Sequence, residues 1–510
     1  MIRTTMTENG LVRGIEAADP RITAFKGIPF AAPPVGENRW RAPQPCANWE
    51  GILEAYRFAP ISVQDTPGIG DNIYNREWHV DSDIAMNEDC LYLNIWTSAK
   101  KAEEKQPVLV WYFGGALQWG YPSEMEFDGE RIARRGVIVV TVNYRINVFG
   151  FLAHPELTAQ QPDAPANFGH LDQQAGLKWV IRNIQAFGGD PENITIAGQS
   201  AGGGSVMSQM TCPKNFGLFQ KAIVLSGMIH NPYKEQFIFK PRGLAEAEEL
   251  GKRFFDFIGV ESLKEARKLD AFYLRDSYAK FAESNDRMMT VIDGCFCIGD
   301  PIKLYAENKH ARVPLMAGNT TDEFPNSIDA ESEEEYRKKV KEIFGDHAEE
   351  FLQFEEAWKQ ENHHYAPVSG IECTVKTLFL KNQEYNNGNN CYYYRFDADI
   401  PGWDHPGNFH SVDLWFFFET LAKCWRPFTG KHYDLARLMC NYWCNFIKNG
   451  DPNGKDADGT DMPHWDPYTK ESPYGIIFST DGVYEVKKNE AEFMKFLVER
   501  TEEELAEEKL

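Results

Sequence analysis

The sequence lacks any long hydrophobic run. Its first thirty residues contain no apolar stretch as long as a secretory signal peptide requires, and no later window approaches the roughly 20 residues of a membrane-spanning helix. We therefore expect the mature chain to begin at Met1, to act in the cytosol and to have no membrane partner.

Positive charge is also scarce. Lys and Arg number 53 against 76 Asp and Glu, which gives a formal net charge of −23. This charge repels phosphate backbones and anionic lipid surfaces, and no basic cluster interrupts it. The composition therefore argues against a nucleic-acid partner.

Neither disulfide nor metal patterns are evident. The ten cysteines are spread along the chain, which is typical of reduced thiols in a cytosolic protein. Cys295 and Cys297 lack a second Cys or His pair at zinc spacing, so we interpret them as core thiols. His363 and His364 lie in a polar stretch and are expected at the surface. We predict no metal and no cofactor.

What the sequence does contain is a series of short apolar segments separated by helical patterns. Because these segments do not alternate with polar residues, they predict strands covered on both faces, as in a mostly parallel sheet. Residues 171–187 have helical spacing and end at two glycines. The pattern predicts an α/β fold with helices flanking the sheet. The expected strands are 107–113, 136–144, 193–198, 221–227, 313–318 and 391–396.

Two charge-rich segments with helical patterns, about 230–310 and 325–390, interrupt the strand series. No linker rich in Pro, Gly or Ser separates them from the rest of the chain. We therefore predict a single domain over 1–510, with these segments as helical excursions that cover a binding site.

The stretch GQSAGGGS at 198–205 directly follows an expected strand. A serine between glycines at a strand-to-helix turn is typical of the nucleophile of α/β hydrolases, although the pattern GxSxG is short and common by chance. Ser200 would need a histidine base that is oriented by a carboxylate. In these enzymes the order along the chain is serine, acid, histidine.

Candidates for both partners follow later expected strands. The segment GNTTDEF offers Asp322 and Glu323, and their spacing does not separate them. The segment NFHSVDLW offers His410, with His405 nearby as a rival base. Oxyanion donors are expected from the amide of Ala201, after the nucleophile, and from the glycine-rich loop at 111–120.

Several ordered segments of the chain resemble the type-B carboxylesterase family, which includes cholinesterases, bile-salt-activated lipases and bacterial para-nitrobenzyl esterases. The resemblance spans nearly the whole sequence. Its segments are FKGIPFAAPPVGENRWRAPQP (25–45), NEDCLYLNIW (87–96), NYRINVFGFL (143–152), NFGHLDQQAGLKWVIRNIQAFGGDPENITIAGQSAGG (167–203), FIKNGDPNG (446–454) and HWDPYT (464–469).

This resemblance implies an α/β hydrolase fold and assigns roles to individual residues. It favours Glu323 over Asp322 as the acid, which leaves Asp322 as a loop cap, and His410 over His405, whose loop matches nothing in the family pattern. The implied residues are the catalytic Ser200, Glu323 and His410 and the oxyanion-hole amides of Gly115, Ala116 and Ala201.

Five positions depart from the commoner family pattern. Phe113 precedes the glycines where His or Tyr is common, and Ala116 replaces the third glycine. Gln199 stands in place of the usual glutamate before the nucleophile. Phe324 replaces the glycine after the acid, and Ser62 stands where a cysteine would pair with Cys90. The missing disulfide agrees with a cytosolic location.

The pocket walls are harder to predict. Trp119, Phe324 and Trp415 are the aromatic residues that we expect to contact the substrate, although most of the run DLWFFFET at 413–420 is expected in the core. Ser226 has two interpretations, a hydrogen-bond partner of the catalytic residues or the cap of a strand end.

Together these features predict hydrolysis of a carboxylic ester through an acyl-enzyme intermediate. The substrate is expected to be an uncharged ester of moderate size with an apolar or aromatic part, because Gln199 carries no charge to hold a cation. Hydrolysis of thioesters, amides or lactones by the same residues is the nearest alternative. A non-catalytic, cholinesterase-like binding protein is another, but such relatives usually lack a triad member. The sequence does not indicate an oligomeric state.

Overall fold

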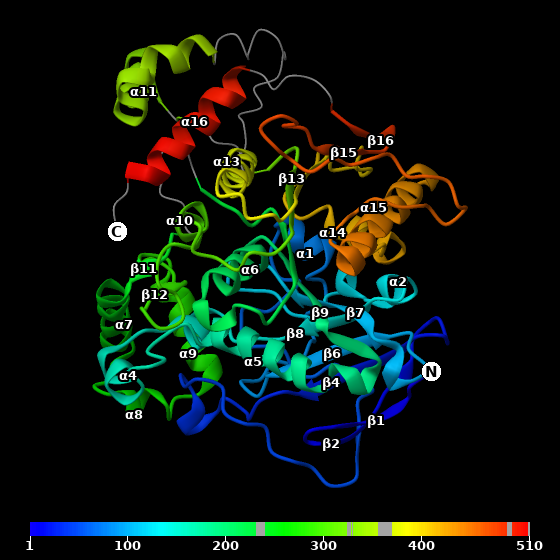
Figure 1. Cartoon of the computed structure of the whole chain (residues 1–510). Coiled ribbons are helices and arrows are strands. Elements are labelled where there is room, and N and C mark those ends of the chain that lie inside the picture. Colours follow the sequence, from blue (N-terminus) through cyan, green and yellow to red (C-terminus); the bar gives the residue numbers. More distant parts are fainter. Residues whose placement is uncertain (231–239, 324–327, 329, 355–369, 487–491, 508–510) are drawn as a thin grey trace.

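A large, mostly parallel sheet runs through the middle of the molecule (Figure 1). The computed structural model describes residues 1–230, 240–323, 328, 330–354, 370–486 and 492–507. The strands are β3 (Ile15–Glu16), β4 (Thr23–Pro29), β6 (Tyr92–Thr97), β7 (Gln106–Tyr112), β8 (Ile138–Val142), β9 (Gly189–Gln199), β10 (Lys221–Leu225), β13 (Leu315–Thr320), β14 (Cys391–Phe396), β15 (Ile476–Ser479) and β16 (Gly482–Glu485).

Their order across the sheet is β16-β15-β14-β13-β10-β9-β7-β8-β6-β4-β3. The pairs from β8 through β7, β9, β10, β13 and β14 to β15 are parallel, and both edges are antiparallel. Each of the six expected strands corresponds to an observed one, with shifts of a few residues at the ends. Two smaller sheets hold β1 (Thr4–Thr7), β2 (Gly10–Arg13) and β5 (Ile52–Glu54), and β11 (Arg242–Gly243) and β12 (Val291–Ile292).

Helices cover both faces of the sheet (Figure 1). One group packs on β9, β10, β13 and β14, and the other packs on β6, β7, β8 and β15. Because both faces are covered, the central strands are apolar throughout, as Val108, Leu109 and Val110 show with no exposed surface. The first group is α5 (Phe168–Asn183), α6 (Ala201–Thr211) and α13 (Gly370–Glu384), with α10 (Pro301–Ala306) packed on α6 and α13, and the second is α2 (Glu130–Ala133) and α15 (Gly430–Asn449), with α14 (Leu414–Phe417) packed on α15.

The two expected helical excursions contain helices where they are described, and the first also holds the short strands β11 and β12. In the first, α7, α8 and α9 lie together at one end of the molecule, beside α4 (Figure 1). In the second, α11 packs with the C-terminal α16 around Phe344, Phe351 and Phe496. These helices are α4 (Pro155–Gln160), α7 (Leu244–Ile258), α8 (Leu263–Ala266), α9 (Ala271–Phe281), α11 (Glu333–Phe344) and α16 (Glu492–Glu507).

One hydrophobic core extends from Val12 to Leu505 and includes the central strands and their flanking helices. The single-domain organisation stays a prediction that this continuous core supports. Among the helices of the described residues, none combines the length and the apolar content needed to cross a bilayer.

Candidate active site

The sharp turn between β9 and α6 carries Ser200. Its φ of 55° and ψ of −125° are unusual for a residue with a side chain, so the turn is strained. The strain is tolerated because small neighbours let the elements approach closely. A Cβ at Gly202 would overlap the carbonyl oxygen of Tyr112, and one at Gly198 would overlap the backbone of Gly202.

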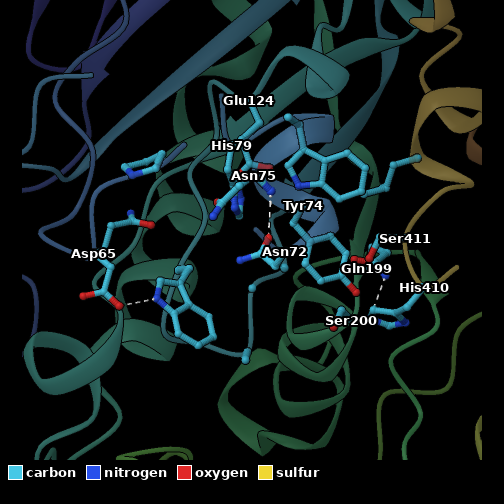
Figure 2. Close-up of a pocket in the computed structure, with 18 of the residues that line it drawn as sticks. Asp65, Asn72, Tyr74, Asn75, His79, Glu124, Gln199, Ser200, His410 and Ser411 are labelled. Atoms are coloured by element: carbon cyan, nitrogen blue, oxygen red, sulfur yellow. Dashed lines mark hydrogen bonds and ion pairs between the residues drawn. The ribbon is translucent and has the colours of Figure 1, made fainter. Parts of the chain in front are cut away.

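His410 and Glu323 lie side by side at the carboxyl ends of two neighbouring strands, after β14 and β13. The Nδ1 atom of His410 is 2.6 Å from Oε2 of Glu323, and both residues are buried. A carboxylate at this distance makes Nδ1 the donor and leaves Nε2 with the lone pair that a general base needs. Figure 2 shows His410 beside Ser200 at one side of a cavity.

The carboxylate of Glu323 is held by further donors. The hydroxyl of Ser226, at the end of β10, donates to Oε1, and the amide of Thr320 donates to the same atom at 3.0 Å. Burial alone would raise the pKa of Glu323, but the charge of His410 and these hydrogen bonds outweigh it and lower that pKa. Of the two interpretations of Ser226, the structure therefore favours the hydrogen-bond partner.

The two rival residues lie elsewhere. Asp322 is exposed, and its Oδ2 accepts a hydrogen bond of 2.6 Å from the amide of Asn408, so it joins the two loops instead of contacting the base. His405 is exposed on the loop before His410. The choice of Glu323 and His410 over these two residues stays a prediction.

Gln199 lies at the base. Its Nε2 is 3.2 Å from Nε2 of His410, so the side-chain amide donates to the lone pair of the imidazole (Figure 2). This hydrogen bond occupies the atom that would accept the proton of Ser200. If His410 is the base, this bond is exchanged for the serine hydroxyl before attack, and catalytic hydrogen bonds often form fully only in the substrate-bound enzyme.

The glycine-rich loop after β7 faces the nucleophile. Gly115 has a φ of 106°, and Ala116 and the following Leu117 also have positive φ, at 55° and 58°. Gly115, Ala116 and Ser200 line the same cavity, while Ala201 begins α6, where N–H groups have no acceptor within the helix. The predicted oxyanion-hole amides are thus gathered near Ser200.

Hydrogen bonds from outside the loop hold this unusual backbone. Gln64 makes two of them with Gly120, since its Oε1 accepts from the amide at 2.8 Å and its Nε2 donates to the carbonyl at 3.0 Å. The amide of Asn147 donates to the carbonyl of Leu117 at 2.7 Å. Sequence reasoning missed Gln64 and Asn147, because only the folded chain brings them to the loop.

The cavity over Ser200 has a volume of about 730 Å³. Its wall opposite the catalytic residues comes largely from the segment 64–79, which includes the short helix α1 (Ile73–Glu77) and carries Tyr74 and Trp78. Of the described lining residues, only Arg287 belongs to the helical excursions. The described parts of the excursions therefore contribute less to the cavity than the sequence suggested.

The expected aromatic contacts are only partly on this wall. Trp119 lines the cavity, whereas Trp415 has no exposed surface and lies behind Trp78, with ring centroids 6.0 Å apart. Trp415 is therefore a core residue, and Trp78 and Tyr74 are the wall residues that sequence reasoning missed. Phe324 lies outside the described residues.

A second buried carboxyl group lies near Glu323 and His410. Asp413 is fully buried, and the hydroxyl of Tyr394 donates to its Oδ2 at 2.8 Å. Burial raises the pKa of Asp413 to about 7, the charge of Glu323 acts in the same direction, and Tyr394 and His410 oppose them.

Of the two thiols expected in the core, Cys297 is buried, whereas Cys295 is only partly buried. No disulfide joins any of the ten cysteines, all of which lie in the described residues. Cys90 is buried, and burial raises the pKa of its thiol, while Ser62, at the position of the missing sulfur partner, acts to lower that pKa. Among the described residues, no cluster of His, Cys, Asp and Glu could hold a metal ion. His363 and His364 lie outside these residues.

Comparisons with known proteins agree with this geometry. The model of the Carboxylesterase family matches residues 2–494. The chain is 31% identical to the fumonisin B1 esterase of Sphingopyxis macrogoltabida, over 90% of this chain and 83% of that protein. It is 30% identical to the para-nitrobenzyl esterase of Bacillus subtilis, over 93% and 94% of the two chains.

Solved structures give the same result. A para-nitrobenzyl esterase superposes with a TM-score of 0.75 at 28% identity, covering 98% of this chain and 100% of the other. The carboxylesterase of Geobacillus stearothermophilus superposes with a TM-score of 0.76 at 29% identity, covering 97% and 99%. The fold is that of the α/β hydrolases, and the chain belongs to the carboxylesterase family of serine hydrolases.

Proposed function

We propose that the chain hydrolyses small uncharged carboxylic esters through an acyl-enzyme intermediate, as a single α/β hydrolase domain in the cytosol. The observation that carries the proposal is the hydrogen-bonded line from Ser226 through Glu323 to His410, which ends beside Ser200 in a cavity of about 730 Å³. No metal or cofactor takes part in the proposed reaction.

The proposed reaction begins when the Ser200 hydroxyl replaces the Gln199 amide at Nε2 of His410. His410 then takes the serine proton as Oγ attacks the carbonyl carbon, and Glu323 stabilises the imidazolium that forms. The amides of Gly115, Ala116 and Ala201 hold the oxyanion. His410 next protonates the departing alcohol, and a water molecule repeats the sequence on the acyl-serine.

The lining of the cavity supports an uncharged substrate with an apolar or aromatic part. Tyr74, Trp78, Trp119 and Phe127 supply aromatic surface. The charged groups on the wall already have partners. Oε1 of Glu124 accepts from the amide of Tyr121 at 2.8 Å and is 3.1 Å from Nε2 of His79. Asp65 and Arg287 both contact Trp119.

A fluorophosphonate probe and a substrate pair test the proposal. We expect the probe to label Ser200 alone, and Ser200→Ala to abolish labelling and to lower kcat by on the order of a thousandfold or more. We also expect para-nitrophenyl butyrate to be a far better substrate than butyrylcholine. Labelling of another residue would refute the assignment, and equal specificity constants would indicate a cation site beside Trp78.

Matched substrates separate the alternatives. Thioesters, lactones and amides would use the same residues, so the comparison needs esters and amides with identical acyl groups. A larger specificity constant for the amide would favour an amidase. A folded protein that takes no label would instead be the non-catalytic binding protein.

A further inference from the structure

A second pocket adjoins the catalytic cavity. Its volume is about 160 Å³, and it shares three lining residues with the cavity, namely Asp65, Trp119 and Arg287. Ser200 and His410 line only the larger cavity. Because the two spaces meet at these three side chains, the shared residues form the wall between them.

The indole of Trp119 is the broad element of this wall, and it is fixed at an edge and at a face. Its Nε1 donates to Oδ2 of Asp65 at 2.9 Å. The guanidinium carbon of Arg287 lies 4.5 Å from the ring centroid, a distance at which a cation is attracted to an indole face. In Figure 2, Asp65 and its hydrogen bond lie across the cavity from Ser200 and His410.

The backbone of Trp119 ties this wall to the oxyanion loop. Its backbone amide donates to the carbonyl of Gly115 at 2.9 Å, and together with the contacts of the ring to Asp65 and Arg287 this bond sets the position of the indole relative to the proposed oxyanion hole. When the oxyanion hole holds the carbonyl group of a substrate, the acyl or alcohol chain of that substrate therefore reaches the indole at a fixed distance from the carbonyl.

We infer that Trp119 determines the longest ester chain that the enzyme accepts, because its indole closes the catalytic cavity against the second pocket. This inference rests on the proposed ester hydrolysis. Esters with short acyl and alcohol chains fit in front of the indole, whereas longer chains would need the space behind it.

The second pocket is polar, so long apolar ester chains would gain only limited binding affinity if the pocket were opened to them. Gln118 and Tyr278 form a hydrogen bond of 2.9 Å on its wall, and Arg275 and Glu283 also line it. Full burial of a methylene improves binding about fourfold, so methylenes that enter this pocket would each contribute less than that. Several of them together are still expected to change the ratio of specificity constants by about tenfold.

The experiment measures kcat/KM for para-nitrophenyl butanoate, hexanoate, octanoate and decanoate, and for butyrate esters of alcohols of increasing length. We expect Trp119→Ala to raise the ratio of decanoate to butanoate, or the matching ratio in the alcohol series, by about tenfold, mainly through KM. Asp65→Ala, which keeps the indole but removes its acceptor, is expected to give a smaller increase of the same kind.

Trp403→Ala is the matched control, because Trp403 is 72% exposed and lines neither pocket. Its ratios are expected to equal those of the wild type. If Trp119→Ala does not fold, Trp119→Phe and Asp65→Ala provide the same comparison. Ratios within twofold of the wild type in both series, in variants that fluorophosphonate still labels, would overturn the inference. Absence of turnover of every ester by the wild type would overturn the proposed function instead.

Discussion

Asp413 is a buried carboxyl group that holds its proton near neutral pH, and its replacement by asparagine is expected to change how stability depends on pH. The side chain has no exposed surface, and only one of its oxygens has a hydrogen-bond partner among the described residues, the hydroxyl of Tyr394. Burial raises the pKa from its ordinary value of 3.8 to about 7.

The direction in which stability changes with pH follows from where the proton is bound. Between those two pKa values the unfolded chain has released the proton of Asp413 and the folded protein has kept it, so rising pH favours unfolding. The difference between the two pKa values corresponds to ~4 kcal/mol of stability in total, and ~3 kcal/mol of this is lost between about pH 5 and about pH 8.5. Asparagine has no proton to lose, so Asp413→Asn removes this contribution.

Urea unfolding followed by tryptophan fluorescence measures the effect. We expect the stability of Asp413→Asn relative to the wild type to rise by ~3 kcal/mol from about pH 5 to about pH 8.5. Groups that do not interact with Asp413 titrate alike in both proteins, so they cancel in this comparison. The exposed Asp481→Asn is the control, and its relative stability is expected to stay constant. A change below about 0.5 kcal/mol for Asp413→Asn would refute the reasoning.

Three further predictions concern neighbouring features. Ser226→Ala removes a donor to the Glu323 carboxylate, and we expect kcat for a short ester to fall about tenfold to a hundredfold with little change in KM; an unchanged kcat would contradict the positioning role. The lowered pKa of Glu323 stabilises the fold above the ordinary pKa of a glutamate, and this contribution is lost as the pH falls through the lower folded value. The stability of Glu323→Gln is therefore expected to fall less steeply with decreasing pH than that of the wild type. Equal slopes would contradict this prediction. Thiol titration without reductant is expected to find ten thiols in denaturant and at most three, Cys46, Cys295 and Cys424, in the native protein, whereas fewer than ten in denaturant would reveal a disulfide.

The parallel strands were predictable because they are buried on both faces and need apolar residues at every position. The run at 391–396 corresponds to β14 without any shift. The strands β4 and β6 were not predicted, since polar residues such as Lys26 and Asn94 break their apolar pattern. Asn94 is nevertheless buried, because its side chain hydrogen bonds with Thr141 on β8.

For the site, residues with a fixed chemical role were easier to predict than residues that only shape the space. Ser200 and His410 follow strands in a known order, so local patterns locate them. Trp78 and Trp415 are both tryptophans close to the site, and only the packing of α1 decides that Trp78 faces the cavity while Trp415 lies behind it. No spacing in the chain carries that information.

The candidate catalytic residues follow three separate strands of one parallel sheet, and this has a consequence for folding. Glu323 and His410 are 87 positions apart, and Gln199 and His410 are 211 apart. Contacts between such distant positions close large loops and form slowly. During refolding, the helices and the first strands can therefore assemble while the enzyme is still inactive. The appearance of activity would then report the docking of β14 against β13, which brings the histidine to a nucleophile already in place.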